Sequence, residues 1–260
     1  MENSDCLFDF AIDRGGTFTD VYYEIYSRTT QKKLHSNIMK ILSEDPSYAD
    51  APREAIRRIL SSHLKQEIPS NKKVLSKNVR SIRMGTTVAT NALLERKGTK
   101  TALLITRGFR DLMIIGTQNR QKIFDLEMKK AEKLFSAVQE IEERVRLIKP
   151  EENHVNILNK IEKGISGDYF EILEEIDEKK TEEQLSELKK SGFNSLAIVL
   201  MFSYAFPNHE LKIETLARKI GFLFISVSHK VVPMVKIVPR GFTTIIDAYL
   251  NPHSNYFSIT

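Results

Sequence analysis

The residues best suited to chemistry lie near the start of the chain, where an acidic residue ends an apolar run and two glycines follow. The segment reads Asp13-Arg-Gly-Gly-Thr-Phe-Thr-Asp20. Because glycine has no Cβ, the backbone N–H groups of Gly15 and Gly16 can approach an anion closely, and successive N–H groups in a tight turn form a concave anion site. Thr17 and Thr19 add hydroxyl donors. The pattern fits a phosphate-binding hairpin and fits equally well a hairpin turn that merely requires glycine.

Two carboxylates flank this turn and indicate a metal site. Mg²⁺ is usually held by one or two carboxylates together with waters and phosphate oxygens. Asp13 is therefore a candidate metal ligand and a candidate catalytic residue, and Asp20 is the second candidate metal ligand.

Other motifs of phosphate, metal or nucleophile chemistry are absent from the sequence. It contains no G-x-G-x-x-G after an expected strand and no G-x-x-x-x-G-K-[ST]. The H-E-x-x-H, C-x-x-C and G-x-S-x-G patterns are missing too, and the six histidines are dispersed. The glycine hairpin is thus the main local signal of function.

The elements that position this hairpin read as alternating strands and helices. Short apolar and β-branched runs predict strands, and apolar residues at helical spacing, such as Ile56, Ile59 and Leu60, predict helices. The strands are expected at 7–12, 18–26, 38–42, 79–84, 100–106, 141–147, 196–202 and 223–227, and the helices at 55–64, 88–97, 181–192 and 208–220.

Two helix starts carry capping signals. Thr181-Glu-Glu-Gln184 is a capping-box pattern, and Asn208 is expected to cap the helix that ends before Gly221. Residues 149–180 are polar and weakly periodic, so they favour an inserted loop or a domain edge. The helix–strand–helix–strand run after residue 180 predicts an α/β layer with a parallel component.

Composition sets the class of protein. The 260 residues are 41% hydrophobic and 28% charged, with 39 Lys+Arg against 34 Asp+Glu, a net charge of +5. A basic cluster at 72–83 lacks the interleaved aromatics of a nucleic-acid site and is interpreted as a solvated loop. Cys6 is the single cysteine, no signal peptide is recognisable, and the longest apolar run is far shorter than the roughly 20 residues of a membrane span. We expect a cytoplasmic protein that binds neither nucleic acid nor membrane.

Several blocks along the chain resemble the 5-oxoprolinases of the hydantoinase A/oxoprolinase family, and they occur in the order found there. They are Phe10 to Val21, Ser43-Glu-Asp-Pro46, Ala51 to Leu60, Arg83 to Gly98, Thr106 to Leu112, Lys122 to Leu126, Leu196 to Met201, Pro233 to Phe242 and Asp247 to Pro252. The resemblance is weakest between about 127 and 180.

The resemblance implies an α/β fold of the actin-like ATPase type, in which two ribonuclease-H-like halves clasp ATP. It implies a mixed sheet with flanking helices, here the first half of a truncated clasp. The family's amino-terminal domain would cover residues 1–230, and 231–260 would begin the next domain, left incomplete. The implied reaction opens 5-oxo-L-proline to L-glutamate with hydrolysis of ATP, in the presence of Mg²⁺.

The resemblance also directs attention to a second turn, Gly85-Thr86-Thr87, between an expected strand and an expected helix. N–H groups at such a place suit an anion. By analogy with the fold, Gly85 and Thr86 are candidate nucleotide contacts and Thr87 is a candidate catalytic residue. Simple capping by threonine is the alternative. Asn91 is a candidate substrate-binding residue.

Arg240 is the remaining candidate for substrate binding, because arginine binds carboxylates through two hydrogen bonds. An ordinary surface arginine is the alternative reading.

Relatives in the family continue well beyond the equivalent of Thr260 and are expected to be homo-oligomers. We expect the second half of the nucleotide clasp in that continuation, and therefore little or no activity from residues 1–260 alone. Two alternatives stay open: a segment of a hydantoinase or acetone carboxylase subunit, and a non-catalytic short protein that binds phosphate or a partner.

Overall fold

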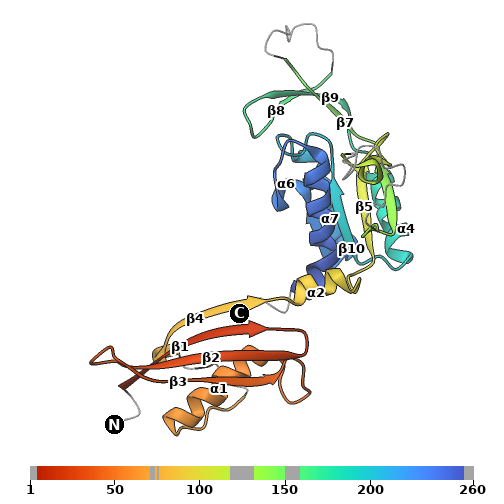
Figure 1. Ribbon diagram of the computed structural model, residues 1–260. Coiled ribbons are helices and arrows are strands. Elements are labelled where there is room, and N and C mark those ends of the chain that lie inside the picture. The colour runs from red at the N-terminus through yellow and green to blue at the C-terminus, as the bar shows by residue number, and fades with distance from the viewer. Residues whose placement is uncertain (1–4, 71–73, 75, 118–131, 150–158, 255–260) are drawn as a thin grey trace, which may run out of the picture. The chain divides into compact units, whose positions relative to one another are not determined.

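The computed structural model describes residues 5–70, 74, 76–117, 132–149 and 159–254 (Figure 1). The chain folds as two compact units that divide between Lys97 and Gly98. Each unit has its own sheet and its own buried core.

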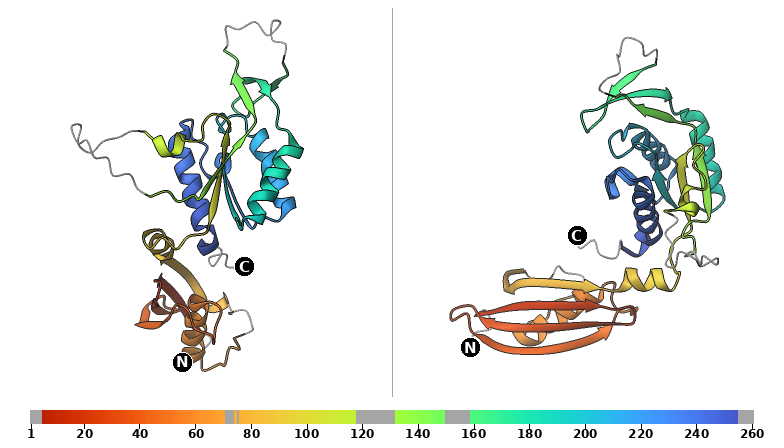
Figure 2. Two further views of the ribbon diagram at one scale, coloured as in Figure 1. Left: turned by 90° about the vertical axis from the view of Figure 1, so that its right-hand side faces the viewer. Right: turned by 45° about the horizontal axis from the view of Figure 1, so that its top comes forward.

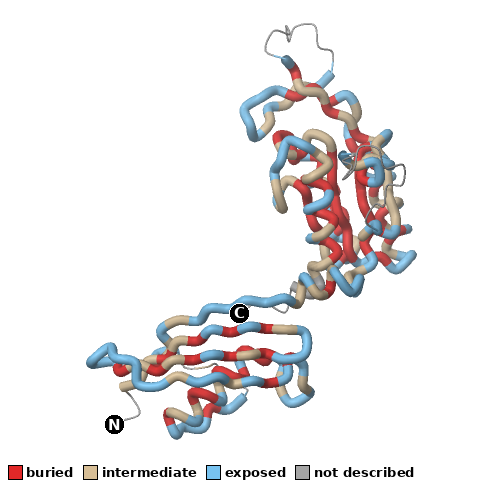
Figure 3. The backbone as a smooth tube through the Cα atoms, viewed as in Figure 1, coloured by how far each residue is buried: buried red, intermediate tan, exposed pale blue. Residues whose placement is uncertain are grey.

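The first unit is built on a four-stranded sheet of order β3-β2-β1-β4. The strands are β1 (Cys6–Arg14), β2 (Phe18–Ser27), β3 (Lys33–Leu42) and β4 (Val79–Thr86). The first three form antiparallel pairs, and β4 runs parallel to β1. Figure 3 shows buried and more exposed residues alternating along β1 and β2, as expected when one face of a strand packs on a core.

Helix α1 (Ala51–Leu64) covers one face of this sheet. It starts where the side chain of Asp50 accepts a hydrogen bond from the N–H of Arg53, a normal N-cap. Its buried stripe packs against alternate residues of β1, among them Phe8 and Phe10. A 3-10 turn η2 (Ser76–Asn78) leads into β4, and the short helix α2 (Val88–Leu94) follows it.

The second unit is a three-layer arrangement around a parallel sheet of order β11-β10-β5-β6. Its strands are β5 (Thr101–Thr106), β6 (Ala137–Ile141), β10 (Ser195–Val199) and β11 (Phe224–Val227). Helices α4 (Glu178–Lys190) and α5 (Asn208–Ile220) pack on one face, while α3 (Leu112–Ile115) and α7 (Ile237–Ser254) pack on the other (Figure 2). The short α6 (Ser228–Val231) follows β11.

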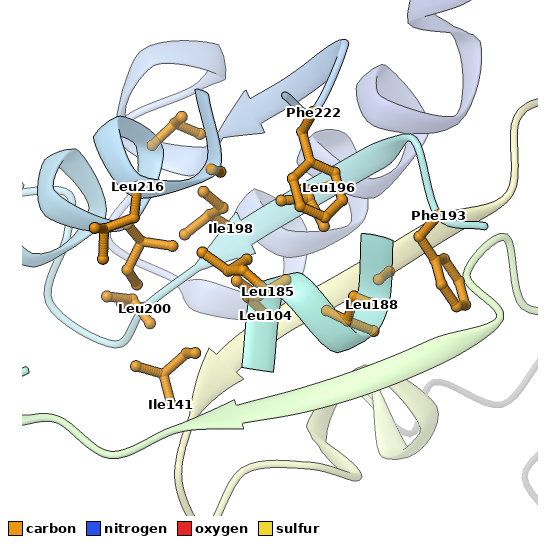
Figure 4. Packing of buried hydrophobic residues seen from close by; sticks show 14 of the residues in the cluster. Leu104, Ile141, Leu185, Leu188, Phe193, Leu196, Ile198, Leu200, Leu216 and Phe222 are labelled. Carbon is orange, nitrogen blue, oxygen red and sulfur yellow. The ribbon is translucent and has the colours of Figure 1, made fainter. Parts of the chain in front are cut away.

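Strands β5 and β10 are buried along their whole length, and part of their cover is the core beneath α4 and α5. Leu104 of β5 and Leu196 and Ile198 of β10 meet Leu185 of α4 and Leu216 of α5 (Figure 4). The intervening residues of both strands face α7 instead. A parallel strand buried on both faces has no polar side, which is why the centre of β5, 102–105, and the segment 196–202 are continuous apolar runs.

A small antiparallel sheet of order β7-β9-β8 completes the second unit. Its strands are β7 (Arg144–Leu147), β8 (Ile161–Lys163) and β9 (Tyr169–Glu174). The single strand predicted at 141–147 is therefore two strands in two sheets. The loop predicted at 149–180 is wrong where β8 and β9 form. Glu171 of β9 is buried and forms an ion pair with Arg146. Because an acid-rich segment is usually exposed, the sequence did not predict a strand here.

Both predicted helix caps differ in the structure. Helix α4 starts one turn earlier, where Asp177 accepts from the N–H of Lys180, and Thr181 is buried inside the helix. Helix α5 has Pro207 at its N-cap, and the side-chain amide of Asn208 donates to Glu162 at 2.9 Å. The helix α7 was not predicted, although it contributes Ile245 and Ala248 to the core.

The structural division at residue 97 differs from the family boundary predicted at 230. Helix α7 belongs to the second unit, where the Ser195 hydroxyl donates to the carbonyl oxygen of Ala248 at 2.6 Å. The boundary at 230 concerns family segments and stays a prediction. Among the described helices, none has the length and apolar character needed to cross a membrane.

Candidate nucleotide-binding hairpin

The glycine turn between β1 and β2 is tight, as the sequence predicts. The N–H of Gly15 donates to the carbonyl oxygen of Phe18 at 3.0 Å. A Cβ at Gly15 would lie 2.9 Å from the same oxygen, so this position has no room for a side chain. Gly16 is exposed, and a Cβ there would meet only the Asn91 side-chain nitrogen, at 3.8 Å. The turn therefore presents bare backbone to solvent.

Ser43, just after β3, ties this turn to the rest of the sheet. Its N–H donates to the Thr17 carbonyl at 2.9 Å, and its hydroxyl donates to the Gly15 carbonyl at 2.7 Å. The Ser43 hydroxyl also lies 2.9 Å from Oγ1 of Thr19. Because the single hydrogen of Ser43 goes to Gly15, Thr19 is the donor in this contact. The backbone carbonyls of the turn thus point inward to Ser43.

This network separates the two predicted threonines. Thr19 is fully buried and its hydroxyl is used by Ser43, so it stabilises the turn from behind. Thr17 is exposed and remains a candidate nucleotide contact. Sequence reasoning missed the role of Ser43, although Ser43 opens one of the blocks that carry the family resemblance.

The two predicted metal ligands lie side by side on the face of the sheet opposite α1. Asp13 and Asp20 are directly paired across β1 and β2. Asp20 also forms an ion pair with Lys40 of β3, with 3.1 Å between the Asp20 carboxylate and Nζ. Asp13 is exposed and has no hydrogen-bond or ion-pair partner among the described residues. One free carboxylate and one shared carboxylate therefore flank the turn.

The end of β4 brings the second predicted turn to the same place. Gly85 pairs with Asp13 and Thr86 with Arg14 in the parallel register. The Thr86 hydroxyl donates to the Arg14 carbonyl at 2.9 Å, and a Cβ at Gly85 would meet nothing within 4 Å.

Thr87 and Asn91 follow at the start of α2. Thr87 has no side-chain capping bond, so the capping alternative does not account for its hydroxyl. The Asn91 side-chain nitrogen lies 3.5 Å from the Thr87 hydroxyl oxygen and near Gly16. All the predicted site residues of the first unit except the inward-facing Thr19 thus gather in one exposed region around the glycine turn.

Arg240, in contrast, is a core residue of the second unit. Its side chain is fully buried on α7. An arginine side chain has five N–H donors, and all five of Arg240 have acceptors within the unit. One is the Ser228 hydroxyl, and the others are the carbonyl oxygens of Leu200, Met201, Met234 and Val235. Burial lowers the pKa of Arg240, and the neighbouring Glu210 carboxylate opposes this effect. No donor is left for a substrate, so this geometry assigns Arg240 a structural role.

The predicted basic loop is also partly used by the fold. Lys72 and Lys73 lie outside the described residues. Arg80 forms a two-pronged pair with Asp9, at 2.9 and 2.5 Å, and its guanidinium lies 3.9 Å from the centre of the Tyr26 ring. The hydrogen bonds from Arg80 are the largest cause of the lowered pKa of Asp9.

Comparison with known proteins identifies the family to which this arrangement belongs. Residues 9–221 match the hydantoinase/oxoprolinase N-terminal region. The chain belongs to the hydantoinase/oxoprolinase family. The match includes the glycine hairpin, the Gly85–Thr87 turn and most of the second unit.

Among the family's curated proteins, 5-oxoprolinase 1 of Arabidopsis thaliana is 46% identical over 244 residues, which is 94% of this chain. The 5-oxoprolinase of Saccharomyces cerevisiae is 43% identical over 249 residues. The chain spans only 19% of the length of each of these relatives. The match lies in their amino-terminal part.

Two solved structures share the fold over 96% of this chain. An acetone carboxylase in its nucleotide-free form superposes with a TM-score of 0.67 at 18% identity, and the chain covers 33% of it. The ATP-dependent caprolactamase of Pseudomonas jessenii superposes with a TM-score of 0.63 at 23% identity, and the chain covers 32% of it. The expected mixed α/β fold, of the actin-like ATPase type, is thereby confirmed.

Proposed function

We propose that this chain is the amino-terminal, phosphate-binding segment of an ATP-dependent enzyme that opens the ring of 5-oxo-L-proline to give L-glutamate. The identity of more than 40% with proteins named 5-oxoprolinase, over nearly the whole chain, is the observation that carries this proposal. A caprolactamase in the same fold supports the wider class, since that protein is also an ATP-dependent enzyme of a cyclic amide.

The hairpin fits a phosphate group. The backbone at Gly15 and Gly16 has no side chains, and Ser43 takes up the turn's carbonyl oxygens, which would otherwise repel an anion. Thr17 adds an exposed hydroxyl. The N–H of Gly15 is bonded to the Phe18 carbonyl, so the N–H groups of Gly16 and Thr17 are the ones available to an anion, which they can bind without a net positive charge. Thr87 and Asn91 would contribute further donors from the neighbouring turn, whereas the hydroxyl hydrogen of Thr86 is already used by the Arg14 carbonyl.

The same region fits Mg²⁺ only in the company of a nucleotide. In the described part of the chain, no group of three or more His, Cys, Asp or Glu side chains could hold a metal. Asp13 supplies one free carboxylate, and Asp20 supplies a second that is shared with Lys40. Mg²⁺ commonly binds through one or two carboxylates, with waters and phosphate oxygens completing the octahedron.

The chemistry explains why a lactam hydrolase would use ATP. An amide is planar and resonance-stabilised, so its carbonyl carbon is a poor electrophile. A phosphoryl group from ATP on the amide oxygen would make the carbonyl carbon a better electrophile for water, and the ring opens when the C–N bond then breaks and the nitrogen takes a proton. The chain's own contribution would be positioning: the hairpin N–H groups would hold phosphate oxygens, and Asp13 would hold the metal ion that offsets their charge.

A chimaeric enzyme tests the proposal directly. The matching amino-terminal 19% of the Arabidopsis relative would be replaced by this chain, and glutamate release from 5-oxo-L-proline would be measured with Mg-ATP. We expect turnover in the chimaera, loss of turnover in its Asp13→Asn variant, and none from the 260-residue chain alone.

Other outcomes would point elsewhere. A folded chimaera that is inactive on 5-oxo-L-proline yet hydrolyses a hydantoin or caprolactam would show that the substrate is a different cyclic amide. Full activity of the Asp13→Asn chimaera would remove Asp13 from the mechanism.

A further inference from the structure

The second unit has a pocket whose lining residues are not used in the proposed reaction. It has a volume of about 370 Å³ and opens between β8, β9 and the start of α5. Its apolar lining consists of the buried Ile172 and Phe206 and the exposed Leu211. Its charged and polar lining includes Lys160, Glu162, Glu175, Lys212 and the buried His209.

His209 is the buried polar group of this pocket. Only 2% of the residue is exposed. Its Nδ1 lies 2.8 Å from Glu143, a carboxylate that is equally buried and also accepts from the Thr106 hydroxyl. Because Glu143 is an acceptor, Nδ1 carries a hydrogen. Nε2, the other ring nitrogen, has no hydrogen-bond partner among the described residues.

The position of the pocket matches a general rule for open parallel sheets. From β5 the chain first adds β6 on one side and later β10 and β11 on the other, so the direction of strand addition switches between β5 and β10. Ligands of such sheets bind outside the carboxyl ends of the strands at this switch. Here Thr106 ends β5 and accepts a hydrogen bond from the N–H of Met201, just beyond β10. Thr106 then donates to Glu143, which holds His209.

The charges around Nε2 favour an anion. Lys212 lies one turn after His209 on α5, and the positive end of the α5 dipole faces the same side. A protein carboxylate already occupies this position: Glu175 lies 3.5 Å from Nε2 and 2.8 Å from the Lys212 ammonium. The hydrogen bond from Lys212 is the main cause of the lowered pKa of Glu175. Its side chain is 42% exposed, so it can turn out to solvent.

We propose that this pocket binds a small organic carboxylate with an apolar body, and that Glu175 occupies the place of the ligand's carboxylate when the ligand is absent. The ligand's carboxylate accepts a hydrogen bond from Lys212, and a second one from His209 Nε2 when the ring carries hydrogens on both nitrogens. Its apolar body rests on Phe206 and Ile172. The other carboxylate of the lining, Glu162, is paired with Lys160, so Lys212 and the positive end of α5 disfavour a cationic ligand. The proposal is independent of the reaction at the glycine hairpin.

The test uses benzoate as the anionic probe and benzyl alcohol as its uncharged counterpart. Binding to the 260-residue chain is measured by calorimetry or by ligand-observed NMR. We expect a benzoate Kd in the millimolar range, about tenfold weaker in Lys212→Gln and about threefold tighter in Glu175→Gln, since charged hydrogen bonds contribute roughly this much. Benzyl alcohol should bind more weakly and respond to neither change.

A matched control is available on the same helix. Lys219 pairs with Glu182 at 3.2 Å and does not line the pocket, so Lys219→Gln should leave benzoate binding unchanged. Three results would each overturn the proposal: no benzoate binding to the unmodified chain, equal binding of both probes, or an equal loss in the Lys212 and Lys219 variants. Lys212 is partly exposed, so its substitution should leave the fold intact.

Discussion

Asp13 and Asp20 face each other directly across the antiparallel pair of β1 and β2, and only Asp20 has a cationic partner, Lys40 at 3.1 Å. Like charges at opposite positions of a sheet lower its stability. If Asp13 had no function, its replacement by a neutral residue would make the protein more stable. Residues that lower stability in this way are typically kept where they are needed for binding or catalysis.

We expect Asp13→Asn to raise the free energy of unfolding by about 0.2–1 kcal/mol, because it removes this repulsion. Urea denaturation of the 260-residue chain measures the change. The matched variant is Asp9→Asn on the same strand, which should lower stability because it breaks the two-pronged pair with Arg80. If both variants lost stability equally, the carboxylate of Asp13 would have a structural role instead of a functional one.

The glycine turn gives a second prediction. Gly15→Ala would place a Cβ 2.9 Å from the Phe18 carbonyl oxygen, so the turn must open and its N–H groups must move. Gly16→Ala meets its nearest atom at 3.8 Å and should fold normally. We expect a loss of about 1–3 kcal/mol of stability for Gly15→Ala alone, measured by thermal or urea unfolding. Equal stability of the two variants would mean that the turn is not held as tightly as its hydrogen bonds indicate.

The hairpin could be predicted from the sequence because its signal is local. The glycines, the carboxylates and the flanking strands all lie within about twenty consecutive residues, and each follows its own propensity. Ser43 could not be assigned in this way. It reaches Gly15 across 28 positions of sequence, and only the pairing of β2 with β3 brings it there. The inward orientation of Thr19 depends on the same contact.

The second unit was harder to predict where charge is buried. Glu171 lies inside β9, and Arg240 lies inside α7, each satisfied by partners distant in sequence. A sequence pattern treats such residues as surface residues, because charged side chains are seldom buried without a partner. The loop expected in place of β8 and β9 and the substrate role expected for Arg240 both followed from this assumption. The strongly apolar strands β5 and β10 posed no such problem.

Arg240 therefore offers a third prediction, on stability. Arg240→Ala would remove the side-chain donors to the carbonyls of Met201 and Met234, and one of the two donors to the carbonyl of Leu200. We expect a loss of about 3–5 kcal/mol in the unfolding of the second unit. Arg110→Ala, at an exposed arginine of the same unit, should change stability by less than about 0.5 kcal/mol. A folded, stable Arg240→Ala variant of the chimaera that lost only substrate affinity would restore the substrate role.

The last prediction concerns acid stability of the first unit. Glu54 is 7% exposed on α1, and hydrogen bonds from Arg57, then Arg58, lower its pKa to about 2 from an ordinary 4.5, against the opposing effect of burial. Because the pKa is depressed in the folded state, the stabilisation is complete above about pH 4.5 and is lost as the pH falls toward 2. Integrated over this window it amounts to roughly 2–3 kcal/mol. Glu54→Gln should remove it at pH 7 and flatten the acid limb of an unfolding curve, whereas Glu183→Gln, at an exposed glutamate of the second unit, should do neither. An unchanged acid limb in Glu54→Gln would show that the Arg57 pair adds nothing to folding.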